Sequence, residues 1–431
     1  MGILESRPFR ELISKLYGEG EDTLKRQVLR YRSLIDTFQT RFGKGEVQLF
    51  STPGRTEIAG NHTDHNGGLV LAGSVHLDTI AAALPTDKET IRVFSEGYPA
   101  PFEVHLSNLE SRASERETTT ALVRGIAASI QELGYRIGGF NAFISSNVGV
   151  GSGLSSSASI EVLIATIMNC LYNNAEISML ELAKIGQYAE NNYFMKPCGL
   201  MDQIACGFGG IVEIDFADSG NPIVRGVEVN LSDYGYNVLV VRTGSDHADL
   251  TEDYANITED MHAAAAIFGK EVCRELSFAD IMDHTSQLRQ EAGDRSFLRS
   301  YHFLTENERV RAQVDALQKG DMHHFLTLVQ GSGHSSALWL QNSFSTRYPL
   351  SQPVTVALAL TEYFFGNREG GAYRVHGGGF AGTIQVFMPE SSCDEYVNFM
   401  ESRIGPGAVT VLRIRSHGSI HINEYLSNRS V

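Results

Sequence analysis

A glycine- and serine-rich stretch near the middle of the chain constrains the fold most. Residues 147–159 read NVGVGSGLSSSAS, and a long apolar run without Gly or Pro follows them. Glycines permit positive φ and let a ligand approach the backbone closely, because no Cβ stands in the way. Apolar residues on nearly every face predict a buried helix after this loop. The free N–H groups and the dipole at the start of that helix favour an anion, so we expect a phosphate there.

The plain alternative is a flexible loop without function, since runs of Gly and Ser are common in such loops. The stretch is not a Walker A motif, because no Gly-Lys-Ser or Gly-Lys-Thr ends it or occurs elsewhere in the chain. It is not a regular GxGxxG motif either. The loop on its own therefore leaves both readings open.

Length and composition limit the number of domains, the location and the kinds of partner that we expect for this chain. A chain of 431 residues is too long for one core, so we expect two domains, residues 1–230 and 231–431, with a helical extension over 8–42. No apolar run is long enough to span a membrane, and the N-terminus does not read as a signal peptide. The net charge of −16 argues against a nucleic-acid partner. Five scattered cysteines predict reduced thiols of a cytoplasmic protein and form no zinc motif. We also expect a monomer.

The pattern of strands and helices predicts an α+β fold. We expect strands over 47–50, 78–84, 90–95, 210–216 and 238–241, and a strand–turn–strand unit over 373–387. Helices are expected over 118–133 and 178–192, the second opened by a capping box. Residues 252–340 read as mostly helical, and one helix there is expected to begin at Thr305 and end at Gly320.

A second informative stretch, residues 53–68, crowds polar side chains between apolar strand ends. Carboxylate, amide and imidazole groups close together suit a polyhydroxylated ligand, because each sugar hydroxyl needs a donor and an acceptor. The alternative is a polar turn held by its own side chains. A metal site at the two histidines is less well supported, because no third ligand is near in sequence. The side chains concerned are Arg55, Asn61, His62, Asp64 and His65.

Two further stretches can each be interpreted either as structural or as functional. Asp202 lies in an otherwise apolar segment, where an acid is either a helix cap or a catalytic group. Three consecutive glycines, residues 377–379, stand between two strands, where they form a tight turn or lie beside a ligand.

Taken together, these stretches resemble the motifs of the galactokinase family within the GHMP small-molecule kinases. Four motifs, residues 53–68, 149–159, 190–203 and 377–382, occur in family order with family spacing. The resemblance covers about residues 38–415. This sequence departs from the family pattern at five positions. Gly149 replaces a Pro, Ala381 replaces a Gly, and Glu57, Asn61 and His65 replace Asn, Glu and Tyr.

The resemblance implies two α+β domains with the active site between them. It also implies a left-handed, ribosomal-protein-like βαβ unit in the first domain and an α/β sandwich in the second. The general preference for right-handed crossovers would not predict that unit.

The resemblance further implies phosphoryl transfer from ATP, with Mg²⁺, to a hexose hydroxyl, where positioning and charge stabilisation supply most of the rate. Arg55 would neutralise charge on the phosphoryl group, and Asp202 would orient the anomeric hydroxyl as a base or an electrostatic anchor. Ser157 and Glu190 would hold Mg²⁺. The implied sugar-binding residues are Arg55, Asn61, His62, Asp64, Gly199, Asp202 and Tyr254. The implied nucleotide-binding residues are Gly149, Gly151, Ser152, Gly153, Leu154, Ser155, Ser156 and Ser157, with Gly377, Gly378 and Gly379 beside the phosphates.

The departures leave the substrate open. Galactose is the first expectation, because the Asn61 amide keeps one acceptor for a sugar hydroxyl. Since Asn61 lacks the negative charge of the family Glu, galacturonate or another C6-modified hexose is the alternative. His65 would add positive charge if protonated. A rival of another class is a sugar-responsive binding protein without turnover.

Overall fold

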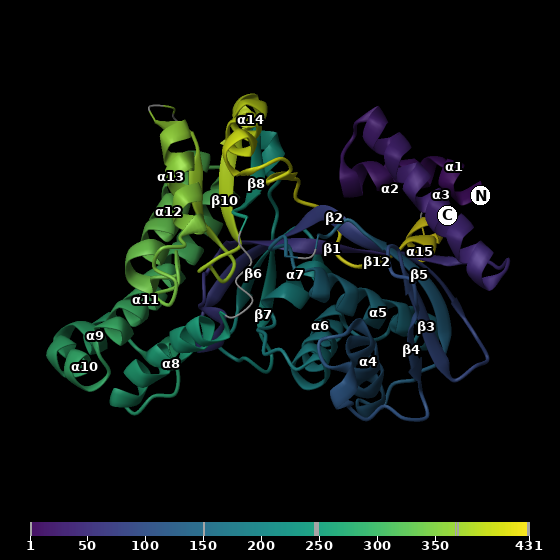
Figure 1. Ribbon diagram of the computed structural model, residues 1–431, viewed down its shortest axis with the longest axis horizontal. Helices are drawn as coiled ribbons and strands as arrows, with labels where there is room; N and C mark the ends of the chain where they lie inside the picture. The colour runs from purple at the N-terminus through teal and green to yellow at the C-terminus, as the bar shows by residue number, and fades with distance from the viewer. Residues whose placement is uncertain (1, 150, 245–249, 367, 369, 429–431) are drawn as a thin grey trace.

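The computed structural model describes residues 2–149, 151–244, 250–366, 368 and 370–428. Within this range the strands form two sheets, and helices cover both of them, so the expected α+β fold is confirmed. The first sheet has the order β12-β1-β2-β5-β3-β4, with β6 and β7 continuing from β2. The second sheet has the order β11-β8-β10-β9. In Figure 1 the first sheet lies towards the right and the second towards the upper left.

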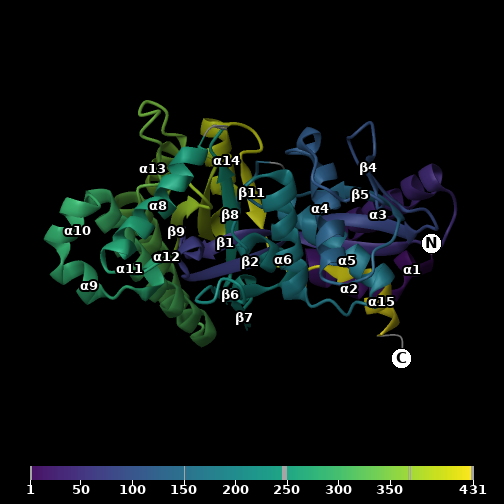
Figure 2. The same ribbon diagram turned by 90° about the horizontal axis from the view of Figure 1, so that it is seen from below.

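Two long antiparallel strands, β1 and β2, connect the two halves of the molecule (Figure 2). They are longer than the sequence predicted, and they are buried along almost their whole length. Two register shifts interrupt their pairing, between Pro53 and Arg55 and between Glu57 and Ala59. Irregularities of this kind re-aim neighbouring side chains. The strands of this sheet are β1 Gln48–Ala59, β2 Leu69–Pro85, β3 Thr90–Ser95, β4 Phe102–His105, β5 Phe140–Ser146, β6 Ile211–Asp215, β7 Ile223–Val227 and β12 Ile420–His421.

Helices pack on both faces of the first sheet (Figure 1). Ser178 caps α6, as expected, and Thr118 caps α4, each accepting a backbone N–H with its hydroxyl oxygen. The extension expected over 8–42 is two helices, because Gly18, at φ 99°, ends the first one. The helices are α1 Gly2–Glu5, α2 Arg7–Tyr17 and α3 Glu21–Phe42 on one face, and α4 Thr119–Glu132, α5 Ser156–Tyr172, α6 Met179–Ala189 and α7 Met201–Phe208 on the other.

Strands β3 and β5 are parallel neighbours, and the chain between them passes first through β4 and then through α4. This connection lies in the first half of the chain, where the resemblance implies a βαβ unit. Its left hand stays a prediction from the resemblance.

The second sheet alternates its apolar side chains between two cores. Val238 and Val240 of β8 face α11 and α12, whereas Leu239 and Val241 face α13 and α14. The strands are β8 Tyr236–Arg242, β9 Ala372–His376, β10 Thr383–Pro389 and β11 Val409–Leu412, and β9 and β10 pair as the expected hairpin. The helices are α8 Thr251–Ile267, α9 Phe278–Asp283, α10 Thr285–Glu291, α11 Asp294–Lys319, α12 Met322–Ser335, α13 Pro353–Phe365 and α14 Cys393–Ile404.

The expected helix start at Thr305 is wrong. Thr305 lies in the middle of α11, and its hydroxyl donates to the carbonyls of Tyr301 and His302 one turn earlier. The helix continues because Phe303 and Val310, on either side of Thr305, are both buried in the protein core. Its end at Gly320, in the left-handed region, is confirmed.

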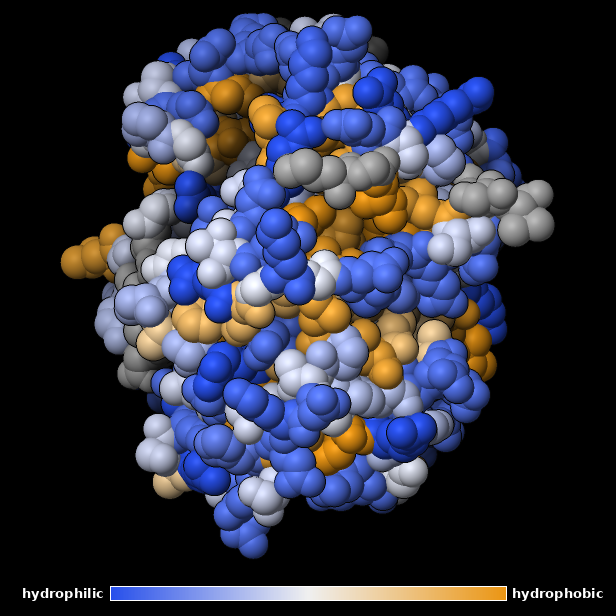
Figure 3. Space-filling view, turned by 90° about the vertical axis from the view of Figure 1, so that its right-hand side faces the viewer, coloured by the Kyte–Doolittle hydropathy of each residue, from blue (hydrophilic) through white to orange (hydrophobic). Residues whose placement is uncertain are grey.

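The C-terminal tail returns to the first sheet. Strand β12 pairs with β1, and α15, Ile422–Ser427, packs near α2 and α3, so both chain ends lie at the same end of the molecule. Buried Asp78 of β2 pairs with Arg30 of α3 at 2.6 Å and with Arg415 of the tail at 2.9 Å. Seen from this end, the surface mixes hydrophilic residues with smaller hydrophobic areas (Figure 3).

The domain boundary near residue 230 stays a prediction, and the C-terminal tail crosses back over any such boundary. No helix of the described ranges is long and apolar enough to cross a membrane.

Candidate active site

The centre of the site is an ion pair between Arg55 and Asp202. Arg55 directly follows the first register shift between β1 and β2, and Asp202 lies in the first turn of α7. Two parallel hydrogen bonds join them, from Nε to Oδ1 at 2.7 Å and from Nη2 to Oδ2 at 2.8 Å. Burial disfavours the charged form of Asp202, but the adjacent guanidinium outweighs it and lowers the pKa of this carboxyl. Asp202 is therefore an anion at neutral pH.

The glycine-rich loop lies directly on this ion pair. Arg55 donates from Nη1 to the carbonyl of Gly153 at 2.5 Å and from its backbone N–H to the carbonyl of Leu154 at 3.0 Å. The hydroxyl of Ser155 donates to Asp202, and Ser155 itself is in the left-handed region at φ 56°. Helix α5 begins at the next residue, so the predicted loop-plus-helix start is confirmed. Val150, inside this loop, lies outside the described residues.

The two predicted magnesium ligands lie side by side. Ser157 is in the first turn of α5, and Glu190 opens a π-helical turn after α6. The Ser157 hydroxyl donates to Glu190 Oε1 at 3.1 Å, although the two residues are far apart in sequence. Lys196 also reaches Glu190 Oε1, at 3.4 Å. A hydroxyl and a carboxylate are oxygen donors of the kind that Mg²⁺ accepts.

Three of the predicted sugar-binding residues, Asn61, His62 and Tyr254, contact the glycine turn between β9 and β10. The His62 ring donates from Nε2 to the Gly378 carbonyl at 2.8 Å, and the Tyr254 hydroxyl donates to the Gly379 carbonyl at 3.2 Å. Burial lowers the pKa of His62 to about 4, so the ring is neutral at pH 7. Asp64 lies against Gly199, where an added Cβ would come within 2.2 Å of its Oδ2.

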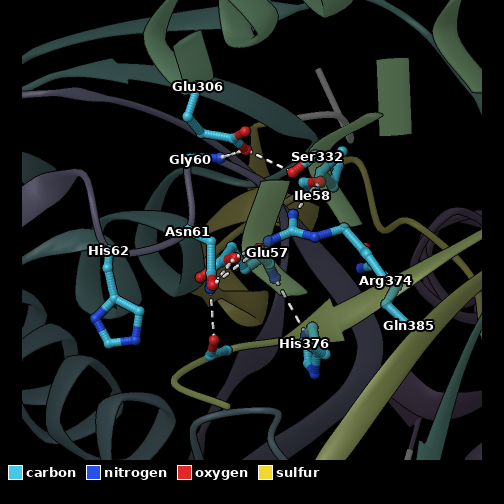
Figure 4. A network of polar contacts seen from close by, with 12 residues as sticks. Glu57, Ile58, Gly60, Asn61, His62, Glu306, Ser332, Arg374, His376 and Gln385 are labelled. Carbon is cyan, nitrogen blue, oxygen red and sulfur yellow. Dashed lines mark hydrogen bonds and ion pairs between the residues drawn. The ribbon is translucent and has the colours of Figure 1, made fainter. Parts of the chain in front are cut away.

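Asn61 belongs to a buried polar network that joins the two halves of the molecule (Figure 4). Its Nδ2 donates to Glu57 at 3.0 Å and to the Gly377 carbonyl at 2.6 Å, while its Oδ1 accepts from Asn342 at 2.6 Å. Glu57 in turn accepts from Arg374 of β9 at 2.6 Å. Protein groups therefore occupy both ends of the Asn61 amide.

The glycine turn also lies close to the glycine-rich loop. An added Cβ at Gly153 would come within 2.6 Å of Thr383 and 3.1 Å of His376, the residues that flank the turn. The four sequence motifs therefore meet in one place, although they are spread over more than half of the chain.

Comparison with known proteins identifies the family. The profile "GHMP kinases N terminal domain" matches residues 121–210, and the profile "Galactokinase galactose-binding signature" matches residues 36–85. A galactokinase of Mannheimia succiniciproducens is 30% identical over 362 residues, which cover 83% of this chain and 89% of the relative. The chain belongs to the galactokinase family. Members of this family are phosphotransferases that act on a sugar hydroxyl.

Other relatives agree with this assignment. A galactokinase of Streptomyces coelicolor is 29% identical over 383 residues, covering 88% of this chain and 94% of the relative. The crystal structure of Lactococcus lactis galactokinase complexed with galactose is similar in fold, with a TM-score of 0.77 at 24% identity, and the match covers 91% of this chain and all of that one. A mevalonate kinase structure matches with a TM-score of 0.60 at 15% identity, which supports the GHMP kinase fold.

Sequence inspection of this galactokinase-family chain overlooked two residues beside the predicted magnesium ligands. Gln203 donates from Nε2 to Glu190 Oε2 at 3.1 Å and to Glu161 Oε2 at 2.9 Å. Glu161 lies one helical turn after Ser157 on α5 and is fully buried. An acid inside an otherwise apolar run was the signal in the sequence that could have identified Glu161.

The structure also explains two of the five departures from the galactokinase pattern. The family pattern has Asn and Glu where this chain has Glu57 and Asn61. Because these two side chains contact each other, the acid and the amide have exchanged places within a single hydrogen-bonded pair. The negative charge is therefore retained beside position 61, and Arg374 compensates it.

Proposed function

We propose that this chain transfers the terminal phosphoryl group of ATP, with Mg²⁺, to the anomeric hydroxyl of D-galactose. The observation that carries the proposal is the position of Asp202, held by two hydrogen bonds from Arg55 and touching Ser155 of the phosphate loop. A sugar hydroxyl bound at Asp202 is therefore next to the groups that would hold the phosphates.

Arg55 and Asp202 have different roles at the reacting atoms. Asp202 is ionised, so it accepts a hydrogen bond from the anomeric hydroxyl, orients it and is placed to take its proton. Arg55 keeps that carboxylate charged and supplies positive charge where the phosphoryl group passes. We assign both residues to catalysis on this basis.

The nucleotide would lie along residues 149–157. The dipole and the free N–H groups at the start of α5 favour its phosphates. Ser157 and Glu190 would hold Mg²⁺, which when bound neutralises phosphate charge. The overall negative charge of the chain makes these local positive groups necessary for binding ATP.

The sugar would bind between Asp64, His62 and Tyr254, with Gly199 leaving room for the Asp64 carboxylate. His62 and Tyr254 now donate to the carbonyls of the glycine turn, so a sugar must share or replace those bonds. Direct contact between Asn61 and the sugar stays a prediction, because it requires Asn61 to release a protein partner.

The second candidate substrate is a hexose with a C6 carboxylate. The observation that favours it is the Glu57–Arg374 ion pair, which leaves no net charge next to Asn61. A sugar acid would therefore meet little repulsion there.

An ADP-release assay with ATP, Mg²⁺ and a panel of hexoses tests the proposal. We expect galactose to give the highest kcat/KM, followed by galacturonate or another C6-modified galactose. Release of ADP with a different hexose only would reject both substrates. Sugar binding without ADP release from any hexose would instead support the rival binding protein.

A further inference from the structure

A group of metal-binding side chains lies away from the active site, where the C-terminal tail meets the end of α5. Cys170 is in the last turns of α5, His421 ends β12, and Glu424 is in the first turn of α15. One ligand atom from each residue lies within 4.8 Å of the other two. Across the described ranges, no other three His, Cys, Asp or Glu residues meet this closely.

The protonation of His421 follows from its neighbours. Gln48 donates from Nε2 to the carbonyl of Glu46 at 3.4 Å, which turns its Oε1 towards His421 Nε2 at 2.9 Å. Since Oε1 only accepts, the hydrogen of the imidazole is on Nε2. The other ring nitrogen, Nδ1, faces Glu424.

The spacing of two of these ligand atoms fits a metal ion. His421 Nδ1 is 3.3 Å from Glu424 Oε2. Two ligand atoms bound to one tetrahedral zinc at the usual bond lengths are about 3.3 Å apart, which matches this nitrogen–oxygen separation.

We propose that Cys170, His421 and Glu424 bind a zinc ion, with water as the fourth ligand. Sulfur, imidazole nitrogen and carboxylate oxygen form a donor set that suits zinc and does not suit magnesium. The Cys170 thiol, kept protonated by burial when no metal is bound, gives up its proton to solvent as the sulfur–zinc bond forms. The half-exposed Glu424 leaves the fourth position open to water.

The surroundings of His421 resemble a prepared metal site. Metal-binding histidines commonly donate their second ring nitrogen to an oxygen acceptor, and Gln48 Oε1 is that acceptor here. The ring also stacks on Phe50 of β1, with centroids 4.6 Å apart, which fixes its plane. Neither contact depends on the metal.

The zinc would attach the tail to α5 without entering the active site. Ser157 and Cys170 are at opposite ends of α5, about 20 Å apart at the rise of an α-helix. Bound zinc should therefore stabilise the protein and hold β12 and α15 in place. The proposal does not depend on which sugar the enzyme phosphorylates.

Cobalt provides the direct test, because Co²⁺ bound to a thiolate absorbs strongly in the near ultraviolet. We titrate the chelator-treated full chain with Co²⁺ and expect one equivalent to produce the thiolate band and Zn²⁺ to abolish it. Cys170→Ser should lose the band. Cys198→Ser is the matched control, because Cys198 is also half-buried but lies near Glu190 at the active site. Loss of the band in Cys198→Ser alone, or no band in the wild type, overturns the proposal.

Two further measurements separate metal binding from misfolding. Saturating Zn²⁺ should raise Tm of the wild type by about 2 °C or more and leave that of Cys170→Ser unchanged. Glu424→Gln changes a half-exposed side chain and should fold normally, yet bind Zn²⁺ about 10-fold more weakly in a competition titration with a chromophoric chelator. Wild-type affinity in Glu424→Gln would remove Glu424 from the site and overturn the three-ligand proposal.

Discussion

Asn61 donates a hydrogen bond from Nδ2 to the Glu57 carboxylate at 3.0 Å, deep between the two halves of the molecule. Glu57 receives a second hydrogen bond from Arg374, so one carboxylate links an amide and a guanidinium (Figure 4). The galactokinase pattern has the amide and the acid in the opposite order. The two positions should therefore be coupled in stability and in substrate choice.

The first prediction tests this coupling. Asn61→Glu should destabilise the protein by about 3 kcal/mol, because it places a second buried carboxylate beside Glu57 with one guanidinium to share. The exchange Glu57→Asn with Asn61→Glu should recover at least about 1 kcal/mol of that loss. Urea unfolding of the wild type, both single variants and the double variant measures the coupling. Additive effects would show that the two positions are independent.

The same double variant also tests the substrate. It moves the negative charge to position 61, so kcat/KM for galacturonate should fall more than kcat/KM for galactose. If both sugars lose activity equally, the charge at position 61 does not select the substrate.

The second prediction concerns Asp202. Asp202→Ala and Asp202→Asn should each lower kcat by at least about 100-fold, because the anomeric hydroxyl loses its anionic acceptor. Nucleotide binding, measured by calorimetry, should persist in Asp202→Asn, which keeps the shape of the side chain beside buried Arg55. Asp218→Asn, in an exposed turn, is the control. A near-normal kcat in Asp202→Asn would remove Asp202 from the catalytic step.

The third prediction concerns the metal. Glu190→Gln and Ser157→Ala should each raise the Mg²⁺ concentration for half-maximal activity by about 10-fold, since Mg²⁺ takes few protein ligands and each matters. The KM for the sugar should stay near the wild-type value. Exposed Glu176→Gln is the control. An unchanged Mg²⁺ requirement in both variants would argue that the metal binds elsewhere.

The fourth prediction uses the close contact at Gly199. Gly199→Ala places a Cβ about 2 Å from the Asp64 carboxylate, which must move, so the KM for the sugar should rise by about 10-fold while the KM for ATP stays constant. Gly226→Ala, whose new Cβ meets nothing within 4 Å, is the matched control. Equal KM values for the sugar in both variants would show that Asp64 does not bind it.

The fifth prediction concerns acid stability. Glu306 of α11 accepts from the Gly60 N–H at 3.2 Å and from the Ser332 hydroxyl at 2.5 Å. Burial opposes its charge, but Arg309 and the other cations around it outweigh burial and lower the pKa of Glu306 to about 2. Because this folded-state pKa lies below the unfolded one, Glu306 stabilises the protein above about pH 4.5. That stability, about 3 kcal/mol, is lost as the pH falls towards 2.

Glu306→Gln should therefore be less stable at neutral pH and should lose less stability between pH 4.5 and pH 2 than the wild type. Chemical denaturation at several pH values measures both effects. Glu308→Gln, exposed on the same helix, should keep the wild-type pH dependence. An unchanged slope in Glu306→Gln would assign the acid sensitivity to other carboxyls.

The sequence alone determined the local elements of this protein and the chemistry of its motifs. Alternating and continuous apolar patterns predicted the strands and the buried helix α5, and the glycine-rich loop predicted an anion site at its start, because these signals act over a few residues. Local signals also misled. Thr305 has the sequence of a helix cap, but buried residues on both sides keep α11 continuous.

Tertiary structure alone decided which of these residues meet. Burial and ion pairing bring Arg55 to Asp202 and Ser157 to Glu190, whereas residue spacing says nothing about contacts between distant segments. In the sequence, Asn61 in place of the family Glu suggests that a negative charge is lost. In the folded chain, Glu57 keeps a carboxylate beside Asn61. The cysteines form no zinc motif in the sequence, yet the returning tail brings His421 and Glu424 to Cys170. Side-chain proximity arises from packing, and only the folded chain fixes it.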